Sequence, residues 1–355
     1  MMRGLLGLLL LCMPALGPGY ELVPDVVPFT LEDLRQLRSD YTDIEGRGPK
    51  QKECGLVYIV SVPFGDVATH QDAVSGVMDE IMTNVELGRA LWNPHASEGV
   101  CAEGPPGAVL FVDPEIWSAL PSESSDRLLS TFSWIVVLPP VARFHNFVPA
   151  RKQKINFGDA AIKFKRVVAY TDMPYFNHTF ILDSDATPCY PGWNQLFKQR
   201  LDEGGDLLQR MAPTRHGASK GNFKFPAPPG HEEDHEWFKY PERNSGHILF
   251  GQSDVAHSVF DQWALSFARQ INEVSPDNKT YVFGDQVAYR EALFLNRNDV
   301  MEVLVNTLCR HRPKEIIPES QRCDIWHEHD ASMCVARAQK FLEDFEAPSP
   351  FSLRN

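Results

Sequence analysis

The chain has 355 residues, of which 43% are hydrophobic and 11% aromatic, so it carries enough apolar side chains for a large buried core. Its formal net charge of −13 argues against nucleic acid or an anionic membrane surface as the main partner.

The first nineteen residues have the pattern of a secretory signal peptide. Arg3 precedes an apolar run over residues 4–16, which is shorter than the roughly 20 residues of a membrane-spanning helix. We expect cleavage after Gly19, and a short uncleaved signal anchor is the alternative. No later stretch of the sequence is predicted to span a membrane.

Beyond this leader the chain contains six cysteines and two glycosylation sequons, which begin at Asn177 and Asn278. An even number of cysteines in an oxidising compartment is compatible with up to three disulfides, and the sequence leaves their pairing open. Together these features predict a protein of the secretory pathway lumen, in the Golgi or the endoplasmic reticulum, or a secreted protein.

Hydrophobic patterns predict strands that alternate with helices. Thr30 can cap a first helix with Leu31, Leu34 and Leu37 on one face, and the following "GRGPKQKE" is typical of a linker. Strands are expected at 56–62, 108–112, 134–138 and 180–182, and helices at 74–85 and 159–170. This alternation predicts an α/β sandwich with a largely parallel sheet.

Residues 214–240 form a long Gly-, Pro- and His-rich stretch, which is usually a functional loop or a disordered segment. A strand at "NSGHILF" follows it. A helix comes next, with Val255, Val259, Trp263 and Phe267 on one stripe, and a further helix begins near "GDQVAYREALFL". The motif "CDIWHEHD" precedes a polar tail that is expected to be helical.

The segment "FILDSDAT" carries the most specific chemistry in the chain. An apolar strand ends there in Asp183 and Asp185, and ligands of parallel sheets gather beyond the carboxyl ends of their strands. Carboxylate oxygens are ligands that Mg2+ and Mn2+ prefer. A divalent cation site is therefore expected at this edge of the sheet.

Two other patterns point to different chemistry. "HEEDH" at 231–235 satisfies the zinc-peptidase motif H-E-x-x-H, but "PAPPG" precedes it and no apolar periodicity supports a helix, so a solvated acidic loop is favoured. "FILDSDAT" also matches the haloacid-dehalogenase phosphatase signature, with Asp183 as nucleophile and Asp185 as general acid. That motif normally opens its domain, and the position of its later aspartate holds Tyr289.

Four blocks in order resemble the glycosyltransferases of the GT-A fold, particularly glycogenin-like and related retaining enzymes. They are "AIKFKRVVAYTDMPYFNHTFILDSD", "ERNSGHILF", "FGDQVAYREAL" and "DIWHEHD". The resemblance implies a Rossmann-like GT-A catalytic domain over residues 55–330. A signal peptide (1–19) and an N-terminal helix with linker (20–54) would precede it, and a C-terminal helix and tail (331–355) would follow.

The resemblance also implies roles for the metal and donor residues. Asp183 and Asp185 would bind Mn2+ or Mg2+, with Asp185 the more direct ligand and Asp183 also facing the ribose. His327 would be the third ligand, with His329 as a competitor. Lys163 would reach the diphosphate or the donor sugar, and nearby Lys165 is the alternative.

The remaining roles concern the reaction centre and the acceptor. Asp285 and Gln286 would lie by the anomeric carbon, and Asn244 would hold the donor sugar; helix capping by Asp285 and a turn at Asn244 are the structural alternatives. Val60 and Ser61 would pass beneath the base. Trp237 and Phe238 are candidates for stacking on an acceptor sugar, with burial expected for at least one.

These expectations add up to a metal-dependent enzyme that moves a hexose or pentose from a nucleoside-diphosphate sugar to a glycan or glycoprotein. The resemblance favours UDP and retention of configuration. An inverting enzyme would need a carboxylate base, for which Glu242 and Asp285 are candidates. The alternatives are the phosphatase and a non-catalytic lumenal protein that binds sugar nucleotides.

Overall fold

The computed structural model describes residues 29–62, 67–140, 157–171, 173–210, 219–220, 223–224, 227–273, 285–310, 323–327, 334–336 and 339–340. The expected signal peptide, the Asn278 sequon, His329 and much of the 214–240 loop lie outside this part. None of the described helices is both long and apolar enough to cross a membrane.

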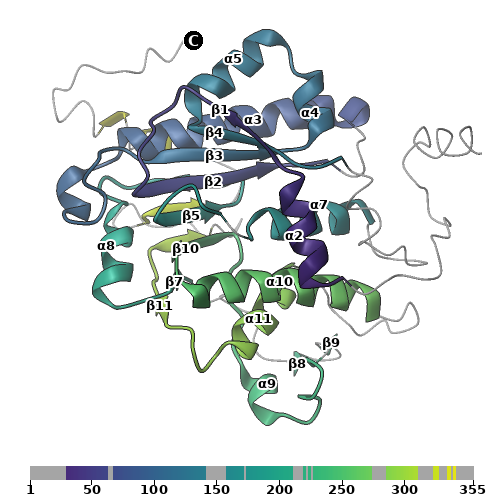
Figure 1. Ribbon diagram of the computed structural model, residues 1–355. Helices are drawn as coiled ribbons and strands as arrows, with labels where there is room; N and C mark the ends of the chain where they lie inside the picture. Colours follow the sequence, from purple (N-terminus) through teal and green to yellow (C-terminus); the bar gives the residue numbers. More distant parts are fainter. Residues whose placement is uncertain are drawn as a thin grey trace, which may run out of the picture.

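A mixed eight-stranded sheet forms the centre of the molecule, in the order β1-β4-β3-β2-β5-β10-β7-β11 (Figure 1). Within it only β1 and β10 run against the other strands, so the expected largely parallel α/β sheet is confirmed. The strands are β1 (Thr42–Glu45), β2 (Cys54–Val60), β3 (Gly107–Val112), β4 (Trp134–Val137), β5 (His178–Leu182), β7 (Leu207–Gln209), β10 (His247–Gly251) and β11 (Glu302–Leu304).

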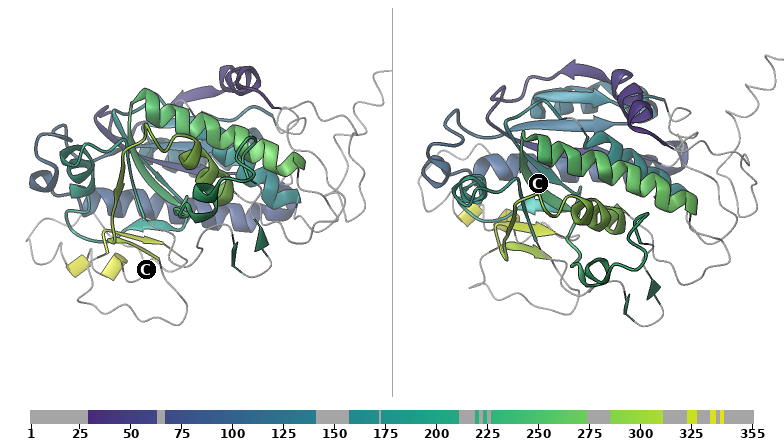
Figure 2. Two further views of the ribbon diagram at one scale, coloured as in Figure 1. Left: turned by 90° about the horizontal axis from the view of Figure 1, so that it is seen from below. Right: turned by 60° about the horizontal axis from the view of Figure 1, so that its bottom comes forward.

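Helices cover both faces of this sheet, and Figure 2 shows α3 and α10 on opposite sides. The α3 face also carries α4, α5 and α8, and the α10 face carries α2, α7 and α11. Their bounds are α2 (Leu31–Ser39), α3 (Val67–Ala90), α4 (Pro114–Ala119), α5 (Ser122–Thr131), α7 (Phe157–Ala169), α8 (Gln195–Asp202), α10 (Asp254–Glu273) and α11 (Asp285–Leu295).

Strand β2 shows why the two cores form. Leu56, Tyr58 and Val60 pack into the core on the α3 face, whereas Val57 packs into the core on the α10 face. Because side chains alternate along a strand, a nearly continuous apolar run can be buried on both faces.

The amino-terminal segment packs onto this domain. Thr30 caps α2 through a reciprocal capping box with Asp33, as expected, but Leu31 is 39% exposed while Leu34 and Leu37 are buried. Strand β1, which the sequence analysis did not predict, then pairs antiparallel with β4. The segment around the predicted linker is thus hydrogen-bonded to the edge of the main sheet.

A second sheet lies at the carboxyl end of β5. It has the order β12-β13-β6, with β6 (Ala186–Pro188), β12 (Leu308–Arg310) and β13 (Ile325–His327). The six cysteines form three disulfides, Cys54–Cys101, Cys189–Cys334 and Cys309–Cys323. The remaining short elements are η2 (Pro94–Ser97), the β8–β9 hairpin (Ser219–Lys220 and Phe223–Lys224) and α9 (His235–Lys239).

The geometry around α9 rules out the zinc-peptidase reading of "HEEDH". Helix α9 begins only at His235, so His231 is not on the helix. The His231 ring instead packs edge-on against Phe294, with ring centroids 5.2 Å apart. Its Nδ1 lies 3.1 Å from Asp234 Oδ2, and Asp234 caps α9. Glu232, Glu233 and His235 are exposed, so the segment is a largely solvated acidic stretch, as expected, which contacts the domain through His231 and is not a zinc site.

Candidate functional site

The D-x-D motif forms a tight turn at the end of the central strand β5. The Asp183 amide donates to the carbonyl of Gly246 (2.7 Å), and the Ala186 amide donates to the carbonyl of Asp183 (2.9 Å). From the neighbouring helix α3, Asn84 Nδ2 donates to the carbonyl of Ser184 (2.8 Å). Backbone and side-chain hydrogen bonds therefore fix the turn that presents both carboxylates.

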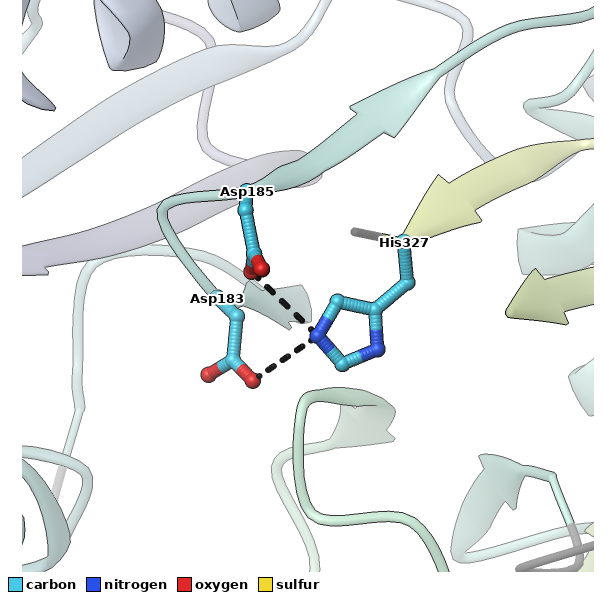
Figure 3. Close-up of side chains that lie close together, drawn as sticks. All are labelled: Asp183, Asp185 and His327. Atoms are coloured by element: carbon cyan, nitrogen blue, oxygen red, sulfur yellow. Dashed lines mark ion pairs between the residues drawn. The ribbon is translucent and has the colours of Figure 1, made fainter. Parts of the chain in front are cut away.

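Strand β13 brings His327 to this turn. It pairs antiparallel with β6, which places His327 opposite Ala186, the residue after Asp185. His327 Nε2 lies 3.3 Å from Asp183 Oδ2 and 3.2 Å from Asp185 Oδ1 (Figure 3). One potential ligand atom from each of the three residues lies within 4.8 Å of the others. The residues that the sequence predicted as metal ligands thus lie together.

The charges of this cluster are strongly coupled. Burial would raise the pKa of Asp183, but the Arg166 guanidinium and His327 outweigh it and hold that pKa well below its usual range. Burial would lower the pKa of His327, but hydrogen bonds to Asp183 and Asp185 raise it to about 9. Two carboxylates and one imidazole suit a hard or borderline divalent cation, and such binding would release the imidazolium proton.

Gly246 of the N-S-G motif lies directly against the cluster. A Cβ atom at this position would collide with the Asp183 carboxylate, and it would lie 2.7 Å from His327 Cε1 and 3.0 Å from Asn244 Oδ1. Because only glycine leaves this space, the motif allows β10 to pass close behind the D-x-D turn.

Arg166, which the sequence analysis did not select, connects the cluster of candidate metal ligands to the G-D-Q segment. Its Nη2 lies 2.5 Å from Asp183 Oδ1 and donates to the carbonyl of Ser245 (2.7 Å). Its Nη1 lies 3.2 Å from Asp285 Oδ2. Arg166 follows Lys163 by three residues and therefore shares a helix face with it, but the sequence does not show which face of the helix meets the aspartates.

The two candidate lysines of α7 lie in different surroundings. Lys163 Nζ is 3.8 Å from Asp285 Oδ1, and its side chain is 45% exposed. Lys165 is buried, and its Nζ contacts Asp113 Oδ2 (2.8 Å) and the carbonyl of Val62 (2.9 Å). Lys163 therefore keeps the candidate role in donor binding, and Lys165 ties α7 to the ends of β2 and β3.

The three residues expected at the reaction centre lie on two elements. Asp285 is the first residue of α11, and its side chain is 10% exposed. Gln286 follows it and is partly buried. Asn244 is buried and its Oδ1 accepts from the Gly246 amide (2.7 Å), so its carbonyl oxygen shapes the N-S-G turn. Direct contact of these residues with a donor sugar stays a prediction.

The predicted base-binding residues follow the end of β2. The Val60 side chain is buried in the core, and Ser61 Oγ donates to Asp113 Oδ2 (3.0 Å). The Ser61 hydroxyl is therefore already engaged by a buried carboxylate. Contact with a nucleotide base at this point stays a prediction.

Of the candidate acceptor residues, Trp237 is buried and Phe238 is 42% exposed. The guanidinium carbon of Arg290 lies over the Trp237 ring, 4.0 Å from the ring centroid.

Two further buried residues lie near the site. The candidate base Glu242 is 2% exposed and interacts electrostatically with Arg290. His247, another residue that the sequence analysis did not select, is buried with its ring perpendicular to that of His327 (87°), 5.3 Å away. The His247 ring thus packs edge-on against the ring of His327, the third candidate metal ligand.

No family model and no curated protein matches the sequence. Among solved structures, the fold is similar to the apo form of mouse xyloside xylosyltransferase 1, with 11% identity and a TM-score of 0.41 over 78% of this chain and 97% of that one. It is also similar to galactosyltransferase LgtC in complex with donor and acceptor sugar analogs, with 11% identity and a TM-score of 0.39 over 84% and 98% of the two chains. At these values the likeness decides nothing about function.

Proposed function

We propose that the protein is a metal-dependent glycosyltransferase that moves a sugar from a nucleoside-diphosphate donor, a UDP-sugar, to a glycan or glycoprotein acceptor. One observation carries the proposal. Asp183, Asp185 and His327 converge at the carboxyl end of β5, and Arg166 joins them to Asp285. Segments that lie far apart in the sequence thus supply cation ligands and further charged groups to one site.

The donor set fits Mn2+ or Mg2+. Three protein ligands leave coordination positions for the oxygens of a diphosphate and for water in an octahedral shell. When bound, the cation neutralises charge that develops on the departing diphosphate. Asp183 and Asp185 would contribute the oxygen ligands, and the deprotonated His327 imidazole would contribute nitrogen.

The neighbouring charges suit the donor sugar and its leaving group. Lys163 is half-exposed and close to Asp285, so it can turn toward a diphosphate. Arg166 holds the Asp285 carboxylate in place, and with Gln286 that carboxylate would stabilise positive charge at the anomeric carbon.

The surroundings of the two candidate bases support retention of configuration. Inversion needs a carboxylate that can take the proton of the acceptor. Glu242 is buried beside Arg290, and Asp285 is held by Arg166. In a retaining reaction the diphosphate itself would accept that proton, so no strong base has to face the acceptor.

The three disulfides support a location in the secretory pathway, because disulfides persist in oxidising compartments. Asn177, the first residue of a predicted sequon, is exposed and accessible to a glycan. We propose a protein of the Golgi or endoplasmic reticulum lumen whose leader is removed.

A transfer assay tests the function. The purified protein is incubated with UDP-sugars and glycan acceptors in Mn2+ or in EDTA, and the anomeric configuration of the product is read by NMR. We expect Mn2+-dependent transfer with retention and a fall in kcat of more than about 100-fold in Asp185→Asn, which removes the negative charge of a proposed carboxylate ligand. Asp202→Asn, at an exposed position of α8, is the control and keeps full activity.

Two results would overturn this assignment. Sugar transfer that persists in EDTA and in Asp185→Asn would remove the cation from the mechanism. Release of phosphate from phosphomonoesters, abolished by Asp183→Asn, would instead identify a phosphatase with Asp183 as its nucleophile.

A further inference from the structure

The third candidate metal ligand is carried by a very short strand. Strand β13 spans only Ile325–His327, and its neighbours β6 and β12 are equally short. Asp183 and Asp185, by contrast, follow β5, which is paired on both sides within the main sheet. A ladder of three-residue strands has few hydrogen bonds, so His327 depends on other constraints for its position.

Two disulfides supply such constraints on both sides of His327. Cys309–Cys323 joins β12 to the position two residues before β13. Cys189–Cys334 joins the residue that follows β6 to a position beyond His327. All four cysteines are buried, and the Cys189 amide also donates to the carbonyl of Asp324 (2.9 Å).

We propose that these two disulfides position His327 as a metal ligand, so that the oxidised protein binds its divalent cation tightly and reduction of the disulfides weakens that binding. The inference rests on the metal site of the proposed function. Cys189–Cys334 and Cys309–Cys323 together are called the His327 clamp below.

The topology explains why the clamp acts on one ligand of the three. Asp183 directly follows β5 of the main sheet, and Asn84 holds the carbonyl of Ser184 between the two aspartates; both constraints remain when the clamp is opened. Opening the clamp removes the covalent ties on both sides of β13, so cation binding then has to order the segment that carries His327. Loss of a group that holds a metal ligand in its orientation typically lowers the metal affinity about 10–100-fold.

The third disulfide provides a matched control. Cys54 is the first residue of β2 and lies in register with His178 at the amino end of β5, whereas Asp183 follows the carboxyl end of that strand. Cys54–Cys101 is also buried. Its removal takes away a covalent link without touching β6, β12 or β13.

The test compares the wild-type protein with three double variants: Cys309→Ala/Cys323→Ala, Cys189→Ala/Cys334→Ala and the control Cys54→Ala/Cys101→Ala. Mn2+ affinity is measured by EPR well below each melting temperature. Backbone hydrogen exchange of residues 323–327 is measured without metal. We expect each clamp variant to bind Mn2+ at least about 10-fold more weakly and to exchange faster at 323–327, while the control matches the wild type.

A positioning role also predicts rescue. Because the ligands are all still present, excess Mn2+ should restore the transferase activity of the clamp variants, whereas a merely unfolded site would not recover. Unchanged Mn2+ affinity and unchanged exchange in both clamp variants would overturn the clamp. If one clamp variant fails to fold, the Mn2+ affinity and hydrogen exchange of the other clamp variant test the proposal. Absence of Mn2+ binding in the wild type would refute the proposed function itself, which separates the two failures.

Discussion

At the residue scale, the close packing of side chains in the candidate site depends on Gly246. A side chain at this position would need space that is already occupied by the Asp183 carboxylate, His327 Cε1 and Asn244 Oδ1. These are two candidate metal ligands and the amide that closes the N-S-G turn. The candidate metal ligands, as well as the turn, can therefore pack this closely only because residue 246 is glycine.

The variant Gly246→Ala tests this packing. We expect a loss of about 1–3 kcal/mol in the free energy of unfolding, since the added methyl group must displace packed atoms. Mn2+ binding should weaken as well, because Asp183 and His327 are the groups that have to move. Urea unfolding and a Mn2+ titration measure the two effects.

Gly76→Ala is the matched control. Gly76 lies within α3, where a Cβ would meet nothing within 4 Å. The same substitution there should stabilise the protein by roughly 0.5–1 kcal/mol and leave Mn2+ binding unchanged. A Gly246→Ala protein as stable as the wild type and with equal Mn2+ affinity would show that the packing is not needed.

Local patterns predicted some site residues and missed others. Asp183 and Asp185 were predictable because an apolar strand that ends in D-x-D is itself a pattern typical of a divalent cation site. His327 was predicted from the family resemblance. Arg166 was missed because the helix carries three neighbouring basic residues, and only the rotation of α7 on the sheet decides which of them meets Asp183. His247 was missed because it looks like any strand residue until β13 packs against it.

At the scale of elements, the basic residues of helix α7 have two different roles: two of them face the candidate site, and one ties the helix to the sheet. Lys163 and Arg166 are three residues apart and both approach Asp285. Lys165 points to the ends of β2 and β3, where it pairs with Asp113 in full burial. The helix is thus fixed to the sheet by one cation and presents two others to the candidate site.

Methionine at each lysine separates these roles. Lys165→Met should cost about 3–5 kcal/mol of stability, because it leaves the Asp113 carboxylate buried without its cationic partner. Lys163→Met should change stability little, since its contact is half-exposed, and should raise the KM for the donor. Urea unfolding and donor kinetics on both variants give the comparison, and equal stability of the two would contradict it.

The strongly apolar strands and the long periodic helices were predictable, whereas helices α5 and α8 and the shortest strands were not. β2, β3, β4 and β5 are apolar runs, and α3, α7 and α10 have clear helical periodicity. By contrast β6, β7, β11, β12 and β13 have three residues each, too few to show a period. Strand β1 alternates weakly and exposes most of its residues, so its pairing with β4 depends on tertiary contact alone.

At the scale of the whole molecule, the two cores enclose the main sheet, and two of the three disulfides lie at the second sheet, beyond the carboxyl end of β5. Helices on both faces hold β5 at the centre, and the second sheet adds His327 from the far end of the chain. Sequence alone could not predict this arrangement, because disulfide pairing and the docking of short strands depend on contacts distant in the chain. The proposed function requires that the carboxyl end of β5 binds a divalent cation together with a nucleoside diphosphate.

Thermal stabilisation by UDP tests that claim most directly. Melting temperatures are measured for the wild type, Asp185→Ala and the exposed-position control Asp202→Ala, with UDP in EDTA and with UDP in Mn2+. A ligand at 100 times its Kd stabilises a protein by about 2.7 kcal/mol, which gives a shift of several degrees or less in a chain of this size. We expect a clear shift with UDP and Mn2+ together in the wild type and in Asp202→Ala, and none in Asp185→Ala. An equal shift in EDTA or in Asp185→Ala would contradict it.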